Sequence, residues 1–418
     1  MELENIETSI SLKSLISEEF LIEQIEISSK SIEINNLISF ARSIFQIPEL
    51  IILEKLFDVK GYIIANIKVE FKKDGSLKDN YVFTGFIKDT KVNLSRDYNL
   101  TKLNFFFDIT KDNIDLENLN VKFNNFDLES KKTSLKKIDD GYLVKGNIKN
   151  DIIELKNEDL IFVKEKFFSG LNIKKIKFNS KNEFSKKINN KLQLRDTIIS
   201  SKIELQEAKI EKKIELKEIF PESKNDISFL NHEIDFNYKK DFLSINGRGK
   251  ILFQKKKDLI SYKIEKIKNK IVFENIFKTK ENPFFIKLLN YEKKNEVETI
   301  IKFNGHKDKK DRIFIKSASL VEEKNKIEIK DINFDKDFRI VKFDNINLDY
   351  IDKDNKKNSI KVYKDKKKYV LKGDYFNSDS LIQNILFSEK DTVFFSKDFE
   401  INLNIKKVRL DNEFQLEN

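Results

Sequence analysis

The sequence predicts a mainly β protein: a long antiparallel meander sheet, curled into an elongated groove, with a few short helices. Hydrophobic and polar residues alternate along most of the chain, as they do in strands with one apolar face. The turns between these runs are rich in Lys, Asp and Asn and are too short to hold crossover helices. In addition, a phrase that runs from Asn118 to Asn147 returns between Asn345 and Asp374, which indicates a repeated structural unit, a β-hairpin.

The composition supports a folded chain and excludes several kinds of site. Of the 418 residues, 39% are hydrophobic and 36% are charged, which is enough apolar material for a core. The chain has 37 Phe but no Cys, so it has no disulfide and no thiolate metal site. Its net charge of +10 comes from Lys that alternates with acidic residues, while Phe and Lys point to opposite faces of the strands. This pattern argues against a nucleic-acid-binding face.

The clearest strand and turn signals fall between residues 61 and 86. Apolar residues alternate with mostly polar ones over residues 63–71, and an Asp74–Gly75 turn then reverses the chain. The same alternation recurs in both copies of the repeated phrase. The residues expected on the apolar face are Ile63, Ala65, Ile67, Val69, Phe71, Leu119, Val121, Phe123, Ile346, Leu348 and Tyr350.

Helical signals occur in three short segments. Residues 37–45 place apolar side chains at helical spacing, Asn282 and Pro283 suit the start of a helix that reaches Glu292, and residues 377–379 can cap a third helix. We therefore expect residues 1–60 to form a mixed segment with short amphipathic helices. Residues 61–418 are expected to form one continuous, repetitive β-groove region with helical insertions near 282–292 and 378–388.

No constellation of catalytic residues stands out, so we expect a protein that is not an enzyme and uses no cofactor or metal. The two histidines are isolated: His232 lies in an alternating run, and His306 lies in a Lys-rich segment interpreted as a solvated turn. The carboxylates alternate with Lys, as on a solvated sheet face, so no acid–base pair can be singled out. Residues 246–250 (NGRGK) lack the spacing of a phosphate loop and are interpreted as a turn or bulge.

The apolar face of such a sheet has to be covered. The expected helices are too few and too short for this, which leaves a second sheet or a curled sheet whose apolar face lines a groove. A nine-residue strand spans roughly 30 Å and a lipid tail reaches about 15 Å, so a groove built from such strands has room for acyl chains.

Three phrases carry a family resemblance: LNYEKK (289–294), LDYIDKDNKKN (348–358) and LKGDYFNSDSLI (371–382). They resemble the AsmA-like envelope proteins, the family that includes YhdP. The similarity is strongest over residues 280–390 and looser over residues 60–150, where the 61–86 hairpin and GYLVKGNIKN (141–150) fit the family pattern.

The resemblance implies phospholipid transport. Members of this family are anchored in the inner membrane by an N-terminal helix, extend across the periplasm, and form a groove with an apolar interior that carries phospholipid toward the outer membrane. The apolar positions named above are accordingly expected to line a groove for phospholipid acyl chains, in the periplasm and with no nucleic-acid partner. The anchor helix is not found in this chain, so we expect a fragment that reaches both membranes through other parts of a longer protein.

Two other interpretations remain open. A long β edge could template strands of an outer-membrane client by strand addition, as the related TamB-like proteins make plausible, which would make the protein a non-enzymatic envelope assembly factor. A secreted scaffold or adhesin would instead have closed sheets and exposed, variable loops.

Overall fold

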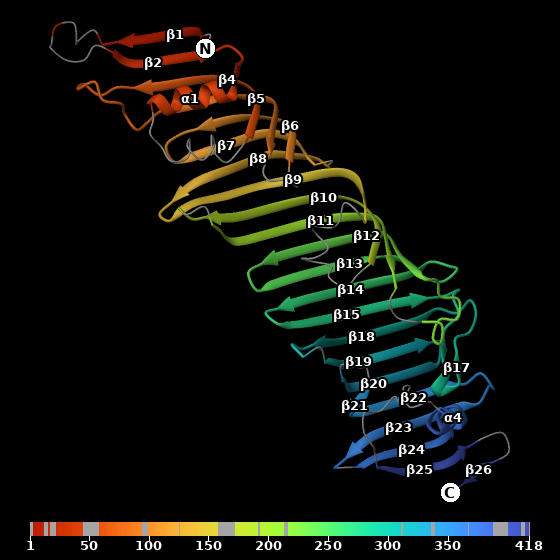
Figure 1. Cartoon of the computed structure of the whole chain (residues 1–418). Coiled ribbons are helices and arrows are strands. Elements are labelled where there is room, and N and C mark those ends of the chain that lie inside the picture. The colour runs from red at the N-terminus through yellow and green to blue at the C-terminus, as the bar shows by residue number, and fades with distance from the viewer. Residues whose placement is uncertain are drawn as a thin grey trace. The chain divides into compact units, whose positions relative to one another are not determined.

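The structure is a computed structural model, and it confirms the mainly β class (Figure 1). It describes residues 3–11, 16, 22–44, 58–93, 99–124, 126–157, 172–190, 193–212, 216–310, 312–335, 339–366, 368–387, 400–410 and 414–417. Within these residues the strands form an open 24-stranded sheet and a separate two-stranded one. The chain divides into two compact units, which are described one at a time.

Unit 1 comprises residues 1–153 and 179–201. From β1 to β9 its strands pair antiparallel in chain order, except that β2 lies between β1 and β4 and that β3 also pairs with β4. Its elements, including strands shared with the second unit, are β1 (Leu3–Ile10), β2 (Ile22–Ser29), β3 (Ile32–Glu33), α1 (Ile34–Ile44), β4 (Asp58–Glu70), β5 (Val82–Asn93), β6 (Asn99–Ile109), β7 (Asn113–Phe123), β8 (Phe126–Ile138), β9 (Gly141–Lys156), β10 (Asn172–Ile188) and β11 (Leu194–Glu211).

Unit 2 comprises residues 154–178 and 202–418. From β12 onward its meander also follows chain order, with two exceptions: β15 pairs directly with β18, and β20 pairs with both β21 and β22. Its remaining elements are β12 (Asp226–Lys239), β13 (Phe242–Leu252), β14 (Asp258–Ile267), β15 (Lys270–Thr279), β16 (Phe285–Ile286), η2 (Lys287–Leu289), β17 (Tyr291–Glu292), β18 (Thr299–Lys307), β19 (Ile313–Glu322), β20 (Asn325–Phe334), β21 (Ile340–Lys342), β22 (Asn345–Ile351), β23 (Lys357–Asp365), β24 (Lys368–Asn377), α4 (Asp379–Phe387), β25 (Ile401–Arg409) and β26 (Gln415–Glu417).

Several local predictions are confirmed. The Asp74–Gly75 turn joins β4 to β5: Asp74 Oδ1 accepts a hydrogen bond from the Ser76 N–H at 2.9 Å, and Gly75 has the positive φ of 82° that this turn requires. Helices form at Ile34–Ile44 and Asp379–Phe387, at the first and third helical signals. Both copies of the repeated phrase form three consecutive strands, β7–β8–β9 and β22–β23–β24.

The helix expected over residues 282–292 is wrong. This segment forms the short strands β16 and β17 around η2, a three-residue 3₁₀ turn, and the chain leaves η2 through Asn290 with φ 51°. The physical reason is tertiary. Phe284 and Tyr291 are both buried in the core, and the Tyr291 hydroxyl donates a hydrogen bond to Glu322 at the end of β19. An extended strand–turn–strand places both rings inward.

Among the described strands of unit 2, the antiparallel rule has one exception. β24 and β25 pair in parallel, with Tyr369 beside Ile401 and Asn377 beside Arg409. Parallel neighbours need a long connection that returns the chain to the starting end of the strand, and α4 lies in this connection. The prediction that every connection is too short for a crossover helix therefore fails at this point.

Two further interpretations are corrected in unit 2. Residues 246–250 form no turn or bulge: they lie inside β13, in unbroken register with β14, and the bulge lies in the neighbouring strand β12 at Asn231 (φ 51°). His306 is not in a turn but in β18, where its ring stacks on Phe314 with centroids 4.7 Å apart.

The long strands of unit 1 bend at β-bulges. Three successive strands carry a residue with a left-handed backbone at a register shift or beside one: Asp89 (φ 47°) in β5, Lys102 (φ 50°) in β6 and Asn118 (φ 51°) in β7. A bulge inserts one residue on one strand and changes which face the following residues point to. Alternation counted from the sequence alone therefore loses its phase at these positions.

Candidate functional site: the apolar face of the sheet

Three rows of apolar side chains cross the strands of unit 2 on one face. Directly opposed residues on neighbouring strands point to the same face, so the register alone makes each row continuous. The first row contains Ile260, Phe277, Ile301, Leu320, Ile327, Leu348 and Ile360. The second row contains Tyr262, Phe303, Ala318, Ile329, Ile346, Val362 and Leu371. The third row contains Phe236, Ile245, Ile264, Phe273, Ile315 and Ile332.

The opposite face of these strands is largely polar. Lys263 lies opposite Glu274, and Glu328 lies opposite Asn347. The ion pair between Arg248 and Glu233 on this face is 2.6 Å long, and more than two thirds of each side chain is exposed. Such exposed pairs contribute little to stability, because water and salt screen them. The chemical contrast between the two faces is therefore strong, and the apolar face is the one that needs a cover.

Protein covers the first row. The segment from Phe284 to Glu292, which we call the cap, packs its Phe284 and Tyr291 side chains into the cluster that contains Leu320, Ile327 and Leu348. Tyr291 is fully buried, with its ring edge-on to Tyr350 at 6.0 Å between centroids. The helix α4 contacts η2, and Figure 1 shows α4 and β17 beside the same ends of the strands.

A buried carboxylate fixes the cap to the sheet. Glu322, at the end of β19, is fully buried and accepts hydrogen bonds from the Tyr291 hydroxyl at 2.9 Å and from the Thr299 hydroxyl at 2.7 Å. Burial, together with the charge of Glu322, raises the pKa of Tyr291. The tyrosine therefore remains a hydrogen-bond donor throughout the pH range in which the protein is handled.

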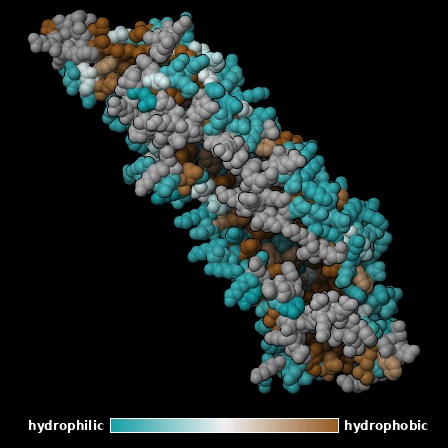
Figure 2. Space-filling view, viewed as in Figure 1, coloured by the Kyte–Doolittle hydropathy of each residue, from teal (hydrophilic) through white to brown (hydrophobic). Residues whose placement is uncertain are grey.

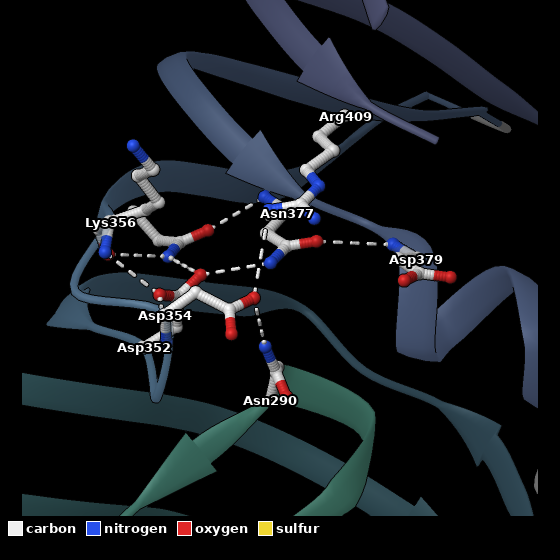
Figure 3. Close-up of polar contacts among 8 residues, drawn as sticks. Asn290, Asp352, Asp354, Lys356, Asn377, Asp379 and Arg409 are labelled. Atoms are coloured by element: carbon white, nitrogen blue, oxygen red, sulfur yellow. Dashed lines mark hydrogen bonds and ion pairs between the residues drawn. The ribbon is translucent and has the colours of Figure 1, made fainter. Parts of the chain in front are cut away.

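A second polar network fixes the cap to the β22–β23 turn (Figure 3). The Asn290 side-chain amide donates to Asp354 at 3.1 Å, and the Lys353 N–H donates to the Asn290 carbonyl at 2.9 Å. In the same turn, Asp352 accepts hydrogen bonds from the side chains of Asn358 and Asn377. The turn, the cap and the start of α4 are thus held together, so the cap is a fixed part of the fold.

The second and third rows are only partly covered and form the candidate site. Ile264, Phe273 and Phe303 are each partly exposed, and the two phenylalanine rings lie 6.2 Å apart. Gly247 and Gly305 lie within these rows, and the Tyr262 ring occupies the space above Gly247. Figure 2 shows hydrophobic residues between hydrophilic margins over the strands of unit 2. The arrangement is a partly open apolar surface on a fixed sheet.

A neutral polar pair borders this surface at β12 and β14. His232 is buried; its Nε2 donates to the Lys250 carbonyl at 2.9 Å, and its Nδ1 accepts from the Tyr262 hydroxyl at 3.3 Å. Burial lowers the pKa of His232 and raises that of Tyr262 to about 12. Both groups are therefore uncharged near neutral pH, and this border adds no charge to the apolar face.

Unit 1 has an apolar face of the same kind. Its residues follow the register from β4 to β9: Ile63, Ala65, Ile67, Phe83, Gly85, Ile87, Phe105, Phe107, Ile109, Ile114, Leu116, Leu135 and Val144. The helix α1 packs Ile34, Leu37 and Ile38 against part of it, over Ile63, Ala65 and Phe107. The remaining positions toward β7, β8 and β9 are partly exposed.

The residues predicted to line a groove lie in three different settings. Ile63, Ala65, Leu348 and Tyr350 are buried under protein: α1 covers the first two, and the Tyr350 hydroxyl donates to the Leu289 carbonyl of the cap at 2.8 Å. Ile346 lies in the second row and is partly exposed. The partly exposed remainder are Ile67, Val69 and Phe71 near the β2 side of β4, and Leu119, Val121 and Phe123 beyond the bulge in β7.

Sequence reasoning missed the centre of the candidate site, which lies in β12 to β18. The alternation in KIEKIKNKIVFENIF (263–277) was a usable signal for the third row and for Phe277. The glycines gave a second signal. A Cβ at Gly247 would lie 2.3 Å from the Tyr262 ring, and one at Gly249 would lie 2.3 Å from the His232 ring, so these glycines make room for aromatic side chains.

Comparisons with known proteins do not identify a family: no family model, curated protein or solved structure matches this chain. Within the described residues, none of the helices is both long enough and apolar enough to span a membrane. No group of three or more His, Asp or Glu side chains in that part of the chain is placed to hold a metal ion.

Proposed function

We propose that this protein binds phospholipid acyl chains on the apolar face of its sheet and passes phospholipid between the inner and outer membranes across the periplasm. One observation carries the proposal. The second and third rows are continuous in register across the strands of unit 2, yet within the described residues most of their side chains are partly exposed, and only Val362 and Ile332 are buried in the cluster under the cap. A protein that buried this face for stability alone would be expected to cover all three rows.

The chemistry of the surface favours acyl chains over a polar ligand. The side chains of the two open rows are aliphatic or aromatic apart from the Tyr262 hydroxyl and Asn275, which lies between Tyr262 and Phe303. Apolar contact is worth about 25 cal/mol for each Å² removed from water, and it requires no specific partner geometry. Such a surface holds a flexible hydrocarbon chain without fixing it, which suits a ligand that has to move.

The envelope setting rests on the resemblance to AsmA-like proteins over residues 280–390. In the structure, the phrases that carry this resemblance build the cap and its polar networks: Tyr291 and Lys293 belong to LNYEKK, Asp352 and Asn358 to LDYIDKDNKKN, and Asn377 to LKGDYFNSDSLI. We propose on this basis that the chain is part of an envelope protein, with the membrane contacts made by other parts of a longer chain.

The test is mass spectrometry of organic extracts from natively purified, detergent-free protein. We expect stoichiometric phospholipid, at more than one molecule per chain because each unit has its own apolar face. The variant Ile264→Asp places a charge in the third row and should lower the retained lipid several-fold. The matched control is Leu259→Asp in the same strand, since Leu259 is 49% exposed on the opposite face.

Two results would contradict the proposal. One is a soluble, monomeric protein that carries no lipid. The other is equal lipid retention in Ile264→Asp and Leu259→Asp, which would place the lipid somewhere other than on the three rows. If the extract is free of lipid and purified protein instead captures outer-membrane client strands, the assembly-factor interpretation takes its place.

A further inference from the structure

A separate basin lies on the opposite, polar face of unit 1. It encloses about 710 Å³ and is lined by residues from seven strands, β1, β2, β4, β5, β6, β7 and β8. Its floor is apolar: Ile64 and Phe106 are 49% and 52% exposed, and the Phe86 ring lies 4.7 Å from the Phe106 ring. These three side chains are direct cross-strand neighbours, so they form one row on a face that is otherwise polar.

The margins of this basin are acidic. Glu4 lies on one side of the apolar floor, and Asp108, Asp115 and Glu117 lie on the other. One cation of the lining, Lys132, lies 3.2 Å from Asp115 and 3.4 Å from Glu117. The basin residues therefore carry a net negative charge, although the whole chain has a net charge of +10.

The placement of two of these acids is unfavourable in the protein alone. Asp108 and Asp115 are directly opposed on the antiparallel strands β6 and β7. Like charges in this position destabilise a sheet, and Lys132 contacts only one of the two. A cation brought by a ligand would relieve this repulsion, and the exposed aromatic floor would be covered by the same ligand.

We propose that this basin binds a short peptide segment of a partner protein, with apolar residues at its centre and basic residues on both sides. The basin has an apolar floor between acidic margins, and this arrangement is complementary to a segment with apolar residues between basic ones. Seven neighbouring strands spaced by about 4.8 Å span roughly 29 Å, which is the length of about eight or nine extended residues. The basin thus accommodates a segment long enough to present both a central anchor and its flanking charges.

The probe is a fluorescein-labelled KKIFLKK peptide, titrated with the full chain and followed by fluorescence anisotropy. Phe106→Ser removes the floor and should weaken binding by about tenfold, since a central aromatic anchor carries much of the energy of such a contact. Asp108→Asn should weaken it by about threefold, the scale of one exposed charge pair. Asp235→Asn, on the polar face of β12 in unit 2, is the matched control and should bind the peptide as the wild type does.

The outcomes separate the possible occupants. Equal binding of KKIFLKK and KKSSSKK would mean non-specific attraction of charge and would overturn the proposal, as would wild-type affinity in Phe106→Ser. Binding of dodecyltrimethylammonium below its micelle concentration, without binding of KKIFLKK, would identify a cationic amphiphile in place of a peptide and would also overturn it. Phe106 lies on the polar face of unit 1, opposite the apolar face that is proposed to bind acyl chains. Phe106→Ser should therefore retain phospholipid at the wild-type level, so this proposal and the proposed function can fail separately.

Discussion

At the scale of single residues, buried polar side chains determine how the apolar face is covered. Asp352 accepts hydrogen bonds from four donors: the backbone N–H groups of Asp354 and Lys356 and the side chains of Asn358 and Asn377. A buried donor without an acceptor costs about 1–3 kcal/mol. The position of the β22–β23 turn, and with it the support of the cap, thus depends on one carboxylate.

Replacing this carboxylate tests its role. Asp352→Ala leaves buried donors of Asn358 and Asn377 without an acceptor, so we expect the free energy of unfolding to fall by about 2–4 kcal/mol. The control Asp349→Ala removes an exposed carboxylate that lies 3.4 Å from Lys357, and it should cost less than about 1 kcal/mol. Urea denaturation followed by circular dichroism measures both. Equal midpoints for the two variants would contradict the assigned role.

The buried histidine makes stability depend on pH in a defined direction. Burial lowers the pKa of His232 below its usual value of 6.5, so the unfolded chain takes up a proton at a pH where the folded chain does not. Stability is therefore highest above about pH 6.5 and falls as the pH decreases below it. The pKa of His306 is also lowered, by partial burial and by Lys270, and acts in the same direction.

The variant His232→Asn separates the two histidines. We expect its loss of stability between pH 7.5 and pH 5.5 to be smaller than that of the wild type, with the remainder due to His306. Thermal denaturation at several pH values between these limits measures the difference, and carboxylates contribute little in this range. An unchanged pH dependence in His232→Asn would show that His232 does not couple protonation to folding.

At the scale of elements, the sequence predicted what depends on neighbours in the chain. The hairpin at Asp74–Gly75, the strands of both repeat copies and the helices α1 and α4 rest on local alternation, turn chemistry or capping. The segment around η2 was mispredicted because its conformation depends on Glu322, which lies in β19 and accepts from Tyr291. Helix signals at Asn282 and Pro283 could not reveal a partner so distant in sequence.

The candidate site was predictable as a face but not as a set of open positions. The register confirms that Ile346 and Leu348 share a face, as alternation indicated, yet Leu348 lies under the cap and Ile346 is partly exposed. Which row the cap covers follows from tertiary packing. The bulges at Asp89, Lys102 and Asn118 also limit the prediction of which face a residue points to. Nothing in the local sequence determines the position at which a bulge moves the following side chains to the other face.

The strand β13 allows a test at the element scale. A Cβ at Gly247 would lie 2.3 Å from Tyr262, so Gly247→Ala should force this ring out of the second row at a cost of about 1–3 kcal/mol. The neighbouring Asn246 points to the other face, and Asn246→Ala should change stability by less than about 0.5 kcal/mol. The intrinsic fluorescence of tyrosine and the urea midpoint report the two effects. If Gly247→Ala leaves the urea midpoint unchanged, the side chains of the rows are loosely packed.

At the scale of the whole molecule, both units combine a polar face with an apolar face that the described residues cover only in part. Within those residues, α1 packs on this face in unit 1, and the cap with α4 does so in unit 2. Large exposed apolar surfaces are rare on soluble proteins and mark sites of interaction. The repetition of this arrangement in two units indicates that the uncovered rows are a property of the architecture and not of one irregular segment.

An extended apolar surface predicts how affinity depends on ligand length. Each methylene group moved from water to an apolar surface contributes about 0.8 kcal/mol, close to a fourfold gain in affinity. The third row crosses seven strands from β12 to β20, or roughly 29 Å at about 4.8 Å per strand, which exceeds the ~15 Å length of an acyl tail. Affinity should therefore keep rising from an 8-carbon to about a 16-carbon fatty acid.

Displacement of a fluorescent fatty acid from delipidated protein measures this dependence directly. In the wild type, each added pair of methylene groups should lower the displacing concentration until the chain length reaches that of a membrane lipid. Ile264→Asp interrupts the third row near its middle and should flatten the dependence, whereas Leu259→Asp should leave it unchanged because that side chain lies on the polar face. A plateau already at eight carbons would describe a small closed pocket, and the continuous apolar surface inferred from the register would then not be what the ligand occupies.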